Sequence, residues 1–105
     1  MIAANPWRGE AALTLGGRER VLRPSFAALV AAEDELGPLF ALVDRAAGGE
    51  LRLAELVALF WHCLADRDGL TRNALGDAVA SLGLARASAP LRALLGEILR
   101  GAPAA

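Results

Sequence analysis

The segment from residue 53 to residue 64 constrains the fold most, because it is apolar on almost every side of a helix. One set of large side chains recurs at the spacing of a single helical face: Leu53, Leu56, Val57, Phe60 and Leu64. Leu59, Trp61 and Cys63 extend the apolar surface beyond that face. A helix that is apolar all round is covered on several sides. The covering surfaces can belong to this chain or to a partner protein.

Glycine and proline divide the neighbouring sequence into further helices. Ser25 is a suitable N-cap for the first of them. Gly37 and Pro38 end that helix, because glycine suits the C-cap and proline cannot continue a helix. A second helix follows and ends at residues 48–49, which are both glycine. The apolar segment described above then forms the third helix.

Two more helices are predicted towards the end of the chain. Residues 66–69 break the helical pattern, and Thr71 or Asn73 then caps a fourth helix. We expect the fifth helix to open at Ser88, with Pro90 in its first turn, where a missing N–H costs little.

The first two dozen residues have the alternation of a β-hairpin, with a glycine pair at residues 16–17 as its turn. A two-residue turn would place Leu15 opposite Arg18. A three-residue loop would instead place Leu13 opposite Val21. The second register keeps one face of the hairpin apolar, and we favour it for that reason.

These patterns predict a mainly α protein of the α+β class, with an N-terminal β-hairpin followed by a bundle of about five short helices. A chain of 105 residues has the length of a single domain, spanning residues 1–105. Its expected parts are an arm and hairpin (1–24), a helical bundle (25–100) and a frayed tail (101–105).

Charge and composition exclude several classes of partner. Eleven basic and twelve acidic residues give a net charge of −1, which removes the electrostatic attraction that nucleic-acid binding needs. The longest strongly apolar run, residues 56–64, is far shorter than the ~20 residues of a membrane span. A single cysteine and the lack of a signal-peptide pattern favour a reducing, cytoplasmic location.

The sequence contains little that could support catalysis. His62 and Cys63 are the only imidazole and thiol, and as neighbours on a helix they point about 100° apart. We interpret them as a partly exposed histidine beside a core cysteine. Residues 66–77 lack the oxygen ligands of a calcium loop at the required positions, and the acidic residues 33–35 are typical of a solvated helix face. We therefore expect no enzyme activity and no catalytic, cofactor-binding or metal-binding residue.

Three apolar residues are the candidates for binding a protein partner. Trp61 is either a core residue or an exposed anchor, since tryptophan is common among the residues that dominate interfaces. Leu59 widens the same apolar helix. Trp7, in the short polar arm before the hairpin, packs over the hairpin or docks into another subunit.

Several short segments resemble, in their order, one known family. The string Asn5-Pro6-Trp7-Arg8-Gly9-Glu10, the glycine-pair hairpin and Leu22-Arg23-Pro24-Ser25-Phe26 resemble the small tail protein of gene transfer agents, the phage-like particles of alphaproteobacteria. Matching segments continue at residues 28–37, 53–56, 69–72, 76–78 and 83–85. Asn73 departs from the family pattern, which often has glutamate after Thr-Arg.

The resemblance implies a part in building a siphophage-like tail, either as an assembly chaperone that coats the tape-measure protein or as a tail tube component. Tube subunits polymerise through extensive β-sheet, whereas this chain has one hairpin, so we favour the chaperone. The broad apolar surface of the third helix would cover an amphipathic helix of the partner.

Several alternatives stay open at this point. The partner is the tape-measure protein, another tail protein or a second copy of the chain. A structural component would end in the tail of a virion-like particle, and that particle is either functional or a prophage remnant. A small helical adaptor unrelated to tails is the other hypothesis.

Overall fold

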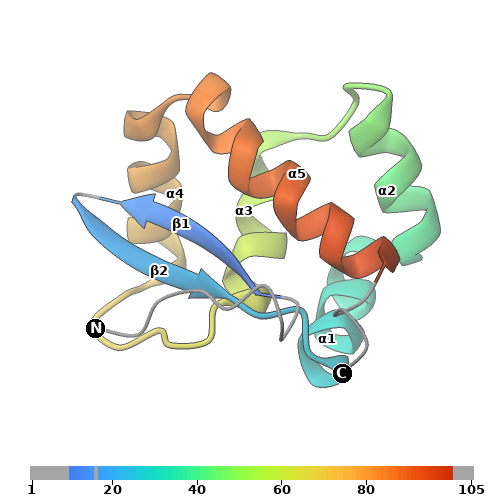
Figure 1. Cartoon of the computed structure of the whole chain (residues 1–105), viewed down its shortest axis with the longest axis horizontal. Helices are drawn as coiled ribbons and strands as arrows, with labels where there is room; N and C mark the ends of the chain where they lie inside the picture. Colours follow the sequence, from blue (N-terminus) through green and yellow to red (C-terminus); the bar gives the residue numbers. More distant parts are fainter. Residues whose placement is uncertain (1–9, 16, 101–105) are drawn as a thin grey trace.

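The computed structural model describes residues 10–15 and 17–100. Within this part, a β-hairpin precedes five helices (Figure 1), which confirms the predicted fold class. The elements are β1 (Ala11–Leu15), β2 (Arg18–Leu22), α1 (Phe26–Leu36), α2 (Leu39–Ala47), α3 (Leu53–Cys63), α4 (Arg72–Leu82) and α5 (Leu84–Arg100). The predicted arm, with Trp7, and the predicted tail lie outside the described residues.

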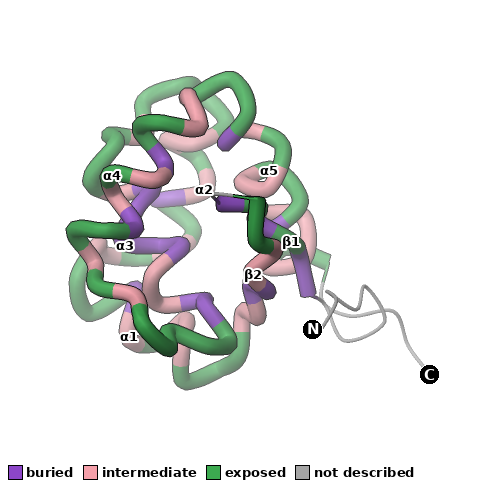
Figure 2. Tube along the Cα trace, turned by 90° about the vertical axis from the view of Figure 1, so that its left-hand side faces the viewer, coloured by how far each residue is buried: buried purple, intermediate pink, exposed green. Residues whose placement is uncertain are grey.

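Helix α3 is the centre of the core. It packs between α1 and α4, and α5 crosses in front of it in Figure 1. Six of its residues are buried: Leu56, Val57, Ala58, Leu59, Phe60 and Cys63. Figure 2 marks the buried stretches of α3 and of the two strands in purple. Each fully buried large side chain contributes about 1.5–3 kcal/mol. This chain itself therefore covers most of the apolar surface of α3.

The register of the hairpin differs from the one that we favoured. Leu15 pairs with Arg18 and Leu13 with Arg20, as a two-residue turn requires. The favoured register was wrong because it assumed that the hairpin buries one face. In the structure Val21 and Leu22, which point to opposite faces, are both buried, with exposed fractions of 7% and 0%.

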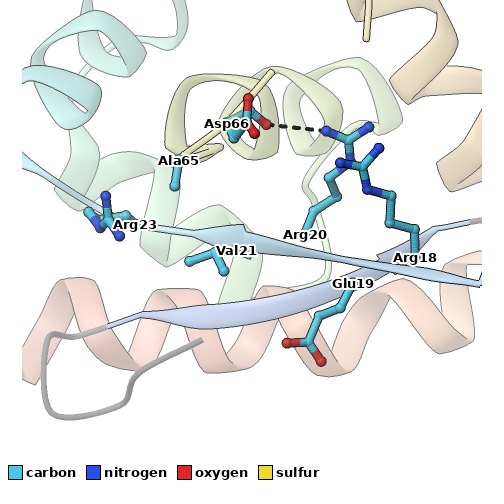
Figure 3. Close-up of a pocket in the computed structure, with 7 residues that line it drawn as sticks. All are labelled: Arg18, Glu19, Arg20, Val21, Arg23, Ala65 and Asp66. Carbon is cyan, nitrogen blue, oxygen red and sulfur yellow. Dashed lines mark hydrogen bonds between the residues drawn. The ribbon is translucent and has the colours of Figure 1, made fainter. Parts of the chain in front are cut away.

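The backbone that follows α3 pairs with the end of β2. Leu22 and Leu64 form an antiparallel bridge. The amide of Arg23 donates to the carbonyl of Cys63 at 2.6 Å, and that of Ala65 donates to the carbonyl of Val21 at 2.9 Å. Figure 3 shows Ala65 facing this end of β2. The pairing joins the hairpin to the backbone that follows α3.

Most predicted helix ends are confirmed. The Ser25 hydroxyl accepts a hydrogen bond from the amide of Ala28 at 3.2 Å, and the Thr71 hydroxyl accepts one from the amide of Ala74 at 3.1 Å. Thr71, not Asn73, is thus the cap of α4. Gly37 ends α1 with a φ of 88°, a conformation that favours glycine.

The start of α5 was predicted wrongly. The helix begins at Leu84, and Pro90 lies inside it. Its first turn closes through the amide of Ala87, which donates to the carbonyl of Gly83 at 3.0 Å. Ala87 is fully buried, so core packing holds this turn in place despite the hydrogen bond that Pro90 cannot make. Ser88 is not a cap; its hydroxyl donates to the carbonyl of Ala85.

Candidate protein-docking surface

A groove with apolar walls lies between α2 and α5. It consists of three hollows of about 210, 540 and 270 Å³ that share lining residues and so form one continuous surface. The walls include Leu39, Phe40, Val43 and Ala46 from α2 and Leu95 and Leu99 from α5. We name this surface the α2–α5 groove.

Large apolar side chains are exposed at both ends of the α2–α5 groove. Phe40 is 83% exposed and Leu99 is 60% exposed at one end. Leu84 and Leu53 are exposed at the other. Contiguous apolar surface of this kind marks sites where proteins bind other proteins. A phenylalanine that becomes buried can remove about 150–250 Å² of surface from water.

The charge beside the α2–α5 groove is basic. Arg92 is the one charged residue among the described residues that line it. The side chain of Arg100 folds back along α5, since a Cβ placed on Gly96 would lie 2.7 Å from its Nη2 atom. Gly96 itself lines the groove. Two guanidinium groups therefore border its α5 side.

A second surface feature surrounds Trp61 on α3. The guanidinium of Arg67 lies 4.7 Å from the centre of the indole ring, and that of Arg72 lies 5.9 Å from it. Arg67 also donates from Nε to the carbonyl of Trp61 at 3.0 Å. Cation–π contacts of this kind cover the ring face with the chain's own arginines.

Glu35 connects this feature to α1. Its carboxylate lies 2.6 Å from Arg72 and 2.8 Å from Nε2 of His62. The hydrogen bond from Arg72, followed by that from His62, lowers the pKa of Glu35 to about 2. Glu33 accepts a hydrogen bond from the amide of Leu39, the first residue of α2. The acidic residues 33–35 are exposed, as expected, but two of them also join helices.

A smaller hollow of about 190 Å³ lies beside β2 (Figure 3). Arginine dominates its lining, and the structure already gives two of these side chains partners. Arg20 donates to the carbonyls of Asp66 and Asp68 at 3.5 and 3.4 Å. Arg23 pairs with the buried Glu10 at 2.6 Å. The Arg20 contacts hold the loop after α3 against the hairpin, and the Arg23–Glu10 pair joins the two ends of the hairpin.

The comparisons with known proteins give one match. The family described as "Phage tail tube protein, GTA-gp10" matches residues 8–101. The chain belongs to this family. Its membership confirms the resemblance to the tail proteins of gene transfer agents. Neither the curated proteins nor the solved structures include a significant match.

None of the three predicted partner-binding residues of this tail protein is among the described residues that line the α2–α5 groove. Trp7 is in the undescribed arm. Leu59 has no exposed surface and packs in the core. Trp61 is partly buried under its arginines. Of the two that the structure describes, Trp61 is the one with exposed surface.

Sequence reasoning missed the α2–α5 groove. The helical periodicity placed the apolar residues of α2 and α5 on buried faces. It did not show which of these residues are covered by another helix or strand. One signal was available. Phe40 lies about 100° from Leu39 and outside the stripe formed by Leu39, Leu42, Val43 and Ala46. This position indicates a large aromatic side chain outside the main buried face.

The residues with catalytic or metal-binding potential are separated in this tail protein. Cys63 is 1% exposed, and its burial raises the thiol pKa to about 12. His62 contacts Glu35 instead. Among residues 10–15 and 17–100, no group of three or more histidine, cysteine and acidic side chains could hold a metal ion. No helix in this part is long and apolar enough to cross a membrane.

Proposed function

We propose that this chain is a non-catalytic tail assembly chaperone of a gene transfer agent, and that it binds the tape-measure protein while the tail is built. The open α2–α5 groove carries the proposal. It is a continuous apolar surface with exposed side chains at both ends, on a protein of a phage tail family. A partner that buried this surface would remove it from water.

The surface proposed here differs from the one suggested by the sequence. The third helix was expected to cover the partner, but α3 lies in the core and most of its large side chains are already packed. The α2–α5 groove provides apolar surface that is still available. A groove between two helices accommodates a third helix in many protein–peptide complexes.

Co-expression with the tape-measure protein of the same particle tests this function. We expect the two proteins to co-elute in size-exclusion chromatography, with light scattering giving several copies of this chain per tape measure. Purified particles should contain little of this chain, because a chaperone leaves before the tail is complete. A chain that elutes alone while the tape-measure protein aggregates would contradict the proposal.

A structural part in the tail tube is the second candidate, and the family description favours it. The small amount of strand argues against it, since β1 and β2 have five residues each. Quantitative mass spectrometry of purified particles separates the two functions. A tube component would be present in many copies per particle and would stay there after assembly.

A further inference from the structure

We infer that the α2–α5 groove receives an amphipathic helix whose apolar stripe is flanked by carboxylates on the side that faces α5. The inference rests on the proposed function, because it names the chemistry of the tape-measure segment that would be bound. It concerns the groove itself and can be tested separately.

The dimensions of the α2–α5 groove suit a helix. On the α5 side its lining extends from Leu84 to Leu99. At 1.5 Å per residue this distance is about 22 Å, or roughly four turns. Leu91, Leu95 and Leu99 succeed one another at intervals of four residues along this wall, so they present one apolar ridge. A helix of about 15 residues would span the groove and place its own apolar stripe against this ridge.

The positive charges beside the groove indicate which residues should flank the apolar stripe of that helix. Arg92 lines the groove, and the guanidinium of Arg100 lies over Gly96, about one turn beyond Arg92 on α5. Neither arginine has a salt bridge within the described residues. No carboxylate lines the groove in this part of the chain. A partner with glutamate or aspartate about one turn apart on one flank would pair with both guanidinium groups.

The same charges disfavour a second copy of the chain as the occupant. In a two-fold symmetric contact each groove would face its own equivalent. Such a contact would bring the Arg92 and Arg100 side chains of two copies to the same interface, and like charges across an interface repel. The acidic-flanked helix satisfies both the apolar walls and the basic border.

Matched variants test the apolar contribution with the full chain. We expect F40A and L99A to weaken co-elution with the tape-measure protein at least about tenfold, because both side chains are exposed at the mouth of the groove. F26A is the control. Phe26 is 85% exposed, which is close to the 83% of Phe40, but lies on α1 outside the groove. All three changes remove exposed side chains, so the variants should fold.

Two synthetic peptides test the charge requirement without the tape-measure protein. Each is an 18-residue helix of leucine and alanine; one carries glutamate along a flank and the other carries lysine at the same positions. We expect the glutamate peptide to bind about tenfold more tightly at low salt and to shift amide NMR signals of α2 and α5. The double variant R92E/R100E should remove or reverse this preference, and R86E, at an exposed position of α5 outside the groove, should leave it unchanged.

The outcomes separate this inference from the proposed function. A tape-measure complex that tolerates F40A and L99A as well as it tolerates F26A would overturn the groove assignment and leave the chaperone function standing. Selective binding of the glutamate peptide in the groove, without any tape-measure complex, would support the groove and reject the function. Equal binding of both peptides, or a dimer of the chain that F40A dissociates, would overturn the inference.

Discussion

The thiol of Cys63 lies in the core beneath the hairpin, where water hardly reaches it. We expect native Cys63 to be almost unreactive towards a thiol reagent at pH 8. Burial raises the pKa from 9.0 to about 12, so the thiolate fraction falls about a thousandfold, a factor of ten per pH unit. The rate of reaction with Ellman's reagent, followed in buffer and in denaturant, measures this difference. Equally fast labelling in both conditions would show that the core around Cys63 opens readily.

Two carboxylates should make the stability of the fold depend on pH in the acidic range. Hydrogen bonds from Arg72 and then His62 lower the pKa of Glu35 to about 2, and Arg45 followed by the amide of Arg52 does the same for Glu55. Because both values lie below the ordinary 4.5, these groups stabilise the fold above pH 4.5. That contribution is lost as the pH falls from 4.5 to about 2.

The double variant E35Q/E55Q isolates this effect. Its melting temperature should be lower than that of the parent at pH 7, and the difference should shrink between pH 4.5 and 2. The control is E97Q, since Glu97 has no salt bridge within the described residues. Parallel pH profiles of the melting temperature for the parent and the double variant would mean that the ion pairs of Glu35 and Glu55 do not contribute to stability in solution.

At the scale of the element, two glycines of α4 should respond oppositely to alanine. Gly76 lies within the helix, and a Cβ there would meet Val57 at 3.8 Å, an ordinary contact. We expect G76A to increase the free energy of unfolding by about 0.5–1 kcal/mol, because glycine is a poor helix former. Gly83 has a φ of 94°, which an alanine adopts only with strain. G83A should therefore lower the free energy of unfolding by about 1 kcal/mol or more. Urea denaturation of both variants tests the signs, and a stabilised G83A would contradict the backbone conformation described for the end of α4.

The elements differ in how far the sequence predicts them. Local chemistry defines most helix ends, as at Ser25 and Gly37, and the sequence alone therefore predicted them. The hairpin register depends on residues 63–65, some forty positions away, and no local pattern contains that pairing. The first turn of α5 likewise depends on the burial of Ala87.

The candidate site was less predictable than the fold. Periodicity indicates that a residue such as Val43 or Leu95 is on an apolar face, but not whether another helix of the chain covers that face. The sequence pointed to Leu59 and Trp61 because α3 is the most apolar helix. That property gives α3 its place in the core, and the exposed apolar side chains of the α2–α5 groove lie mainly on α2 and α5 instead.

At the scale of the whole molecule, the hairpin and the helices share one cluster of buried side chains. We therefore propose that they unfold together. Leu13 of β1 has no exposed surface, and L13A should lower the free energy of unfolding by about 2–5 kcal/mol. Helix content by circular dichroism and the Trp61 environment by fluorescence should give the same shifted urea midpoint. A helix midpoint that L13A leaves unchanged would show that the hairpin folds independently of the helices.

The pairing of β2 with the backbone after α3 also limits how copies of this protein could polymerise. Among the described residues β1 pairs with β2 alone, whereas the far side of β2 is occupied at residues 21–23 by the chain's own residues 63–65. Strand addition on that side of β2 is therefore blocked at residues 21–23. Two molecules that join through β1 close off each other's growth and form a finite pair, whereas a filament needs two different free ends. A tube assembled from this protein would have to repeat through its helices.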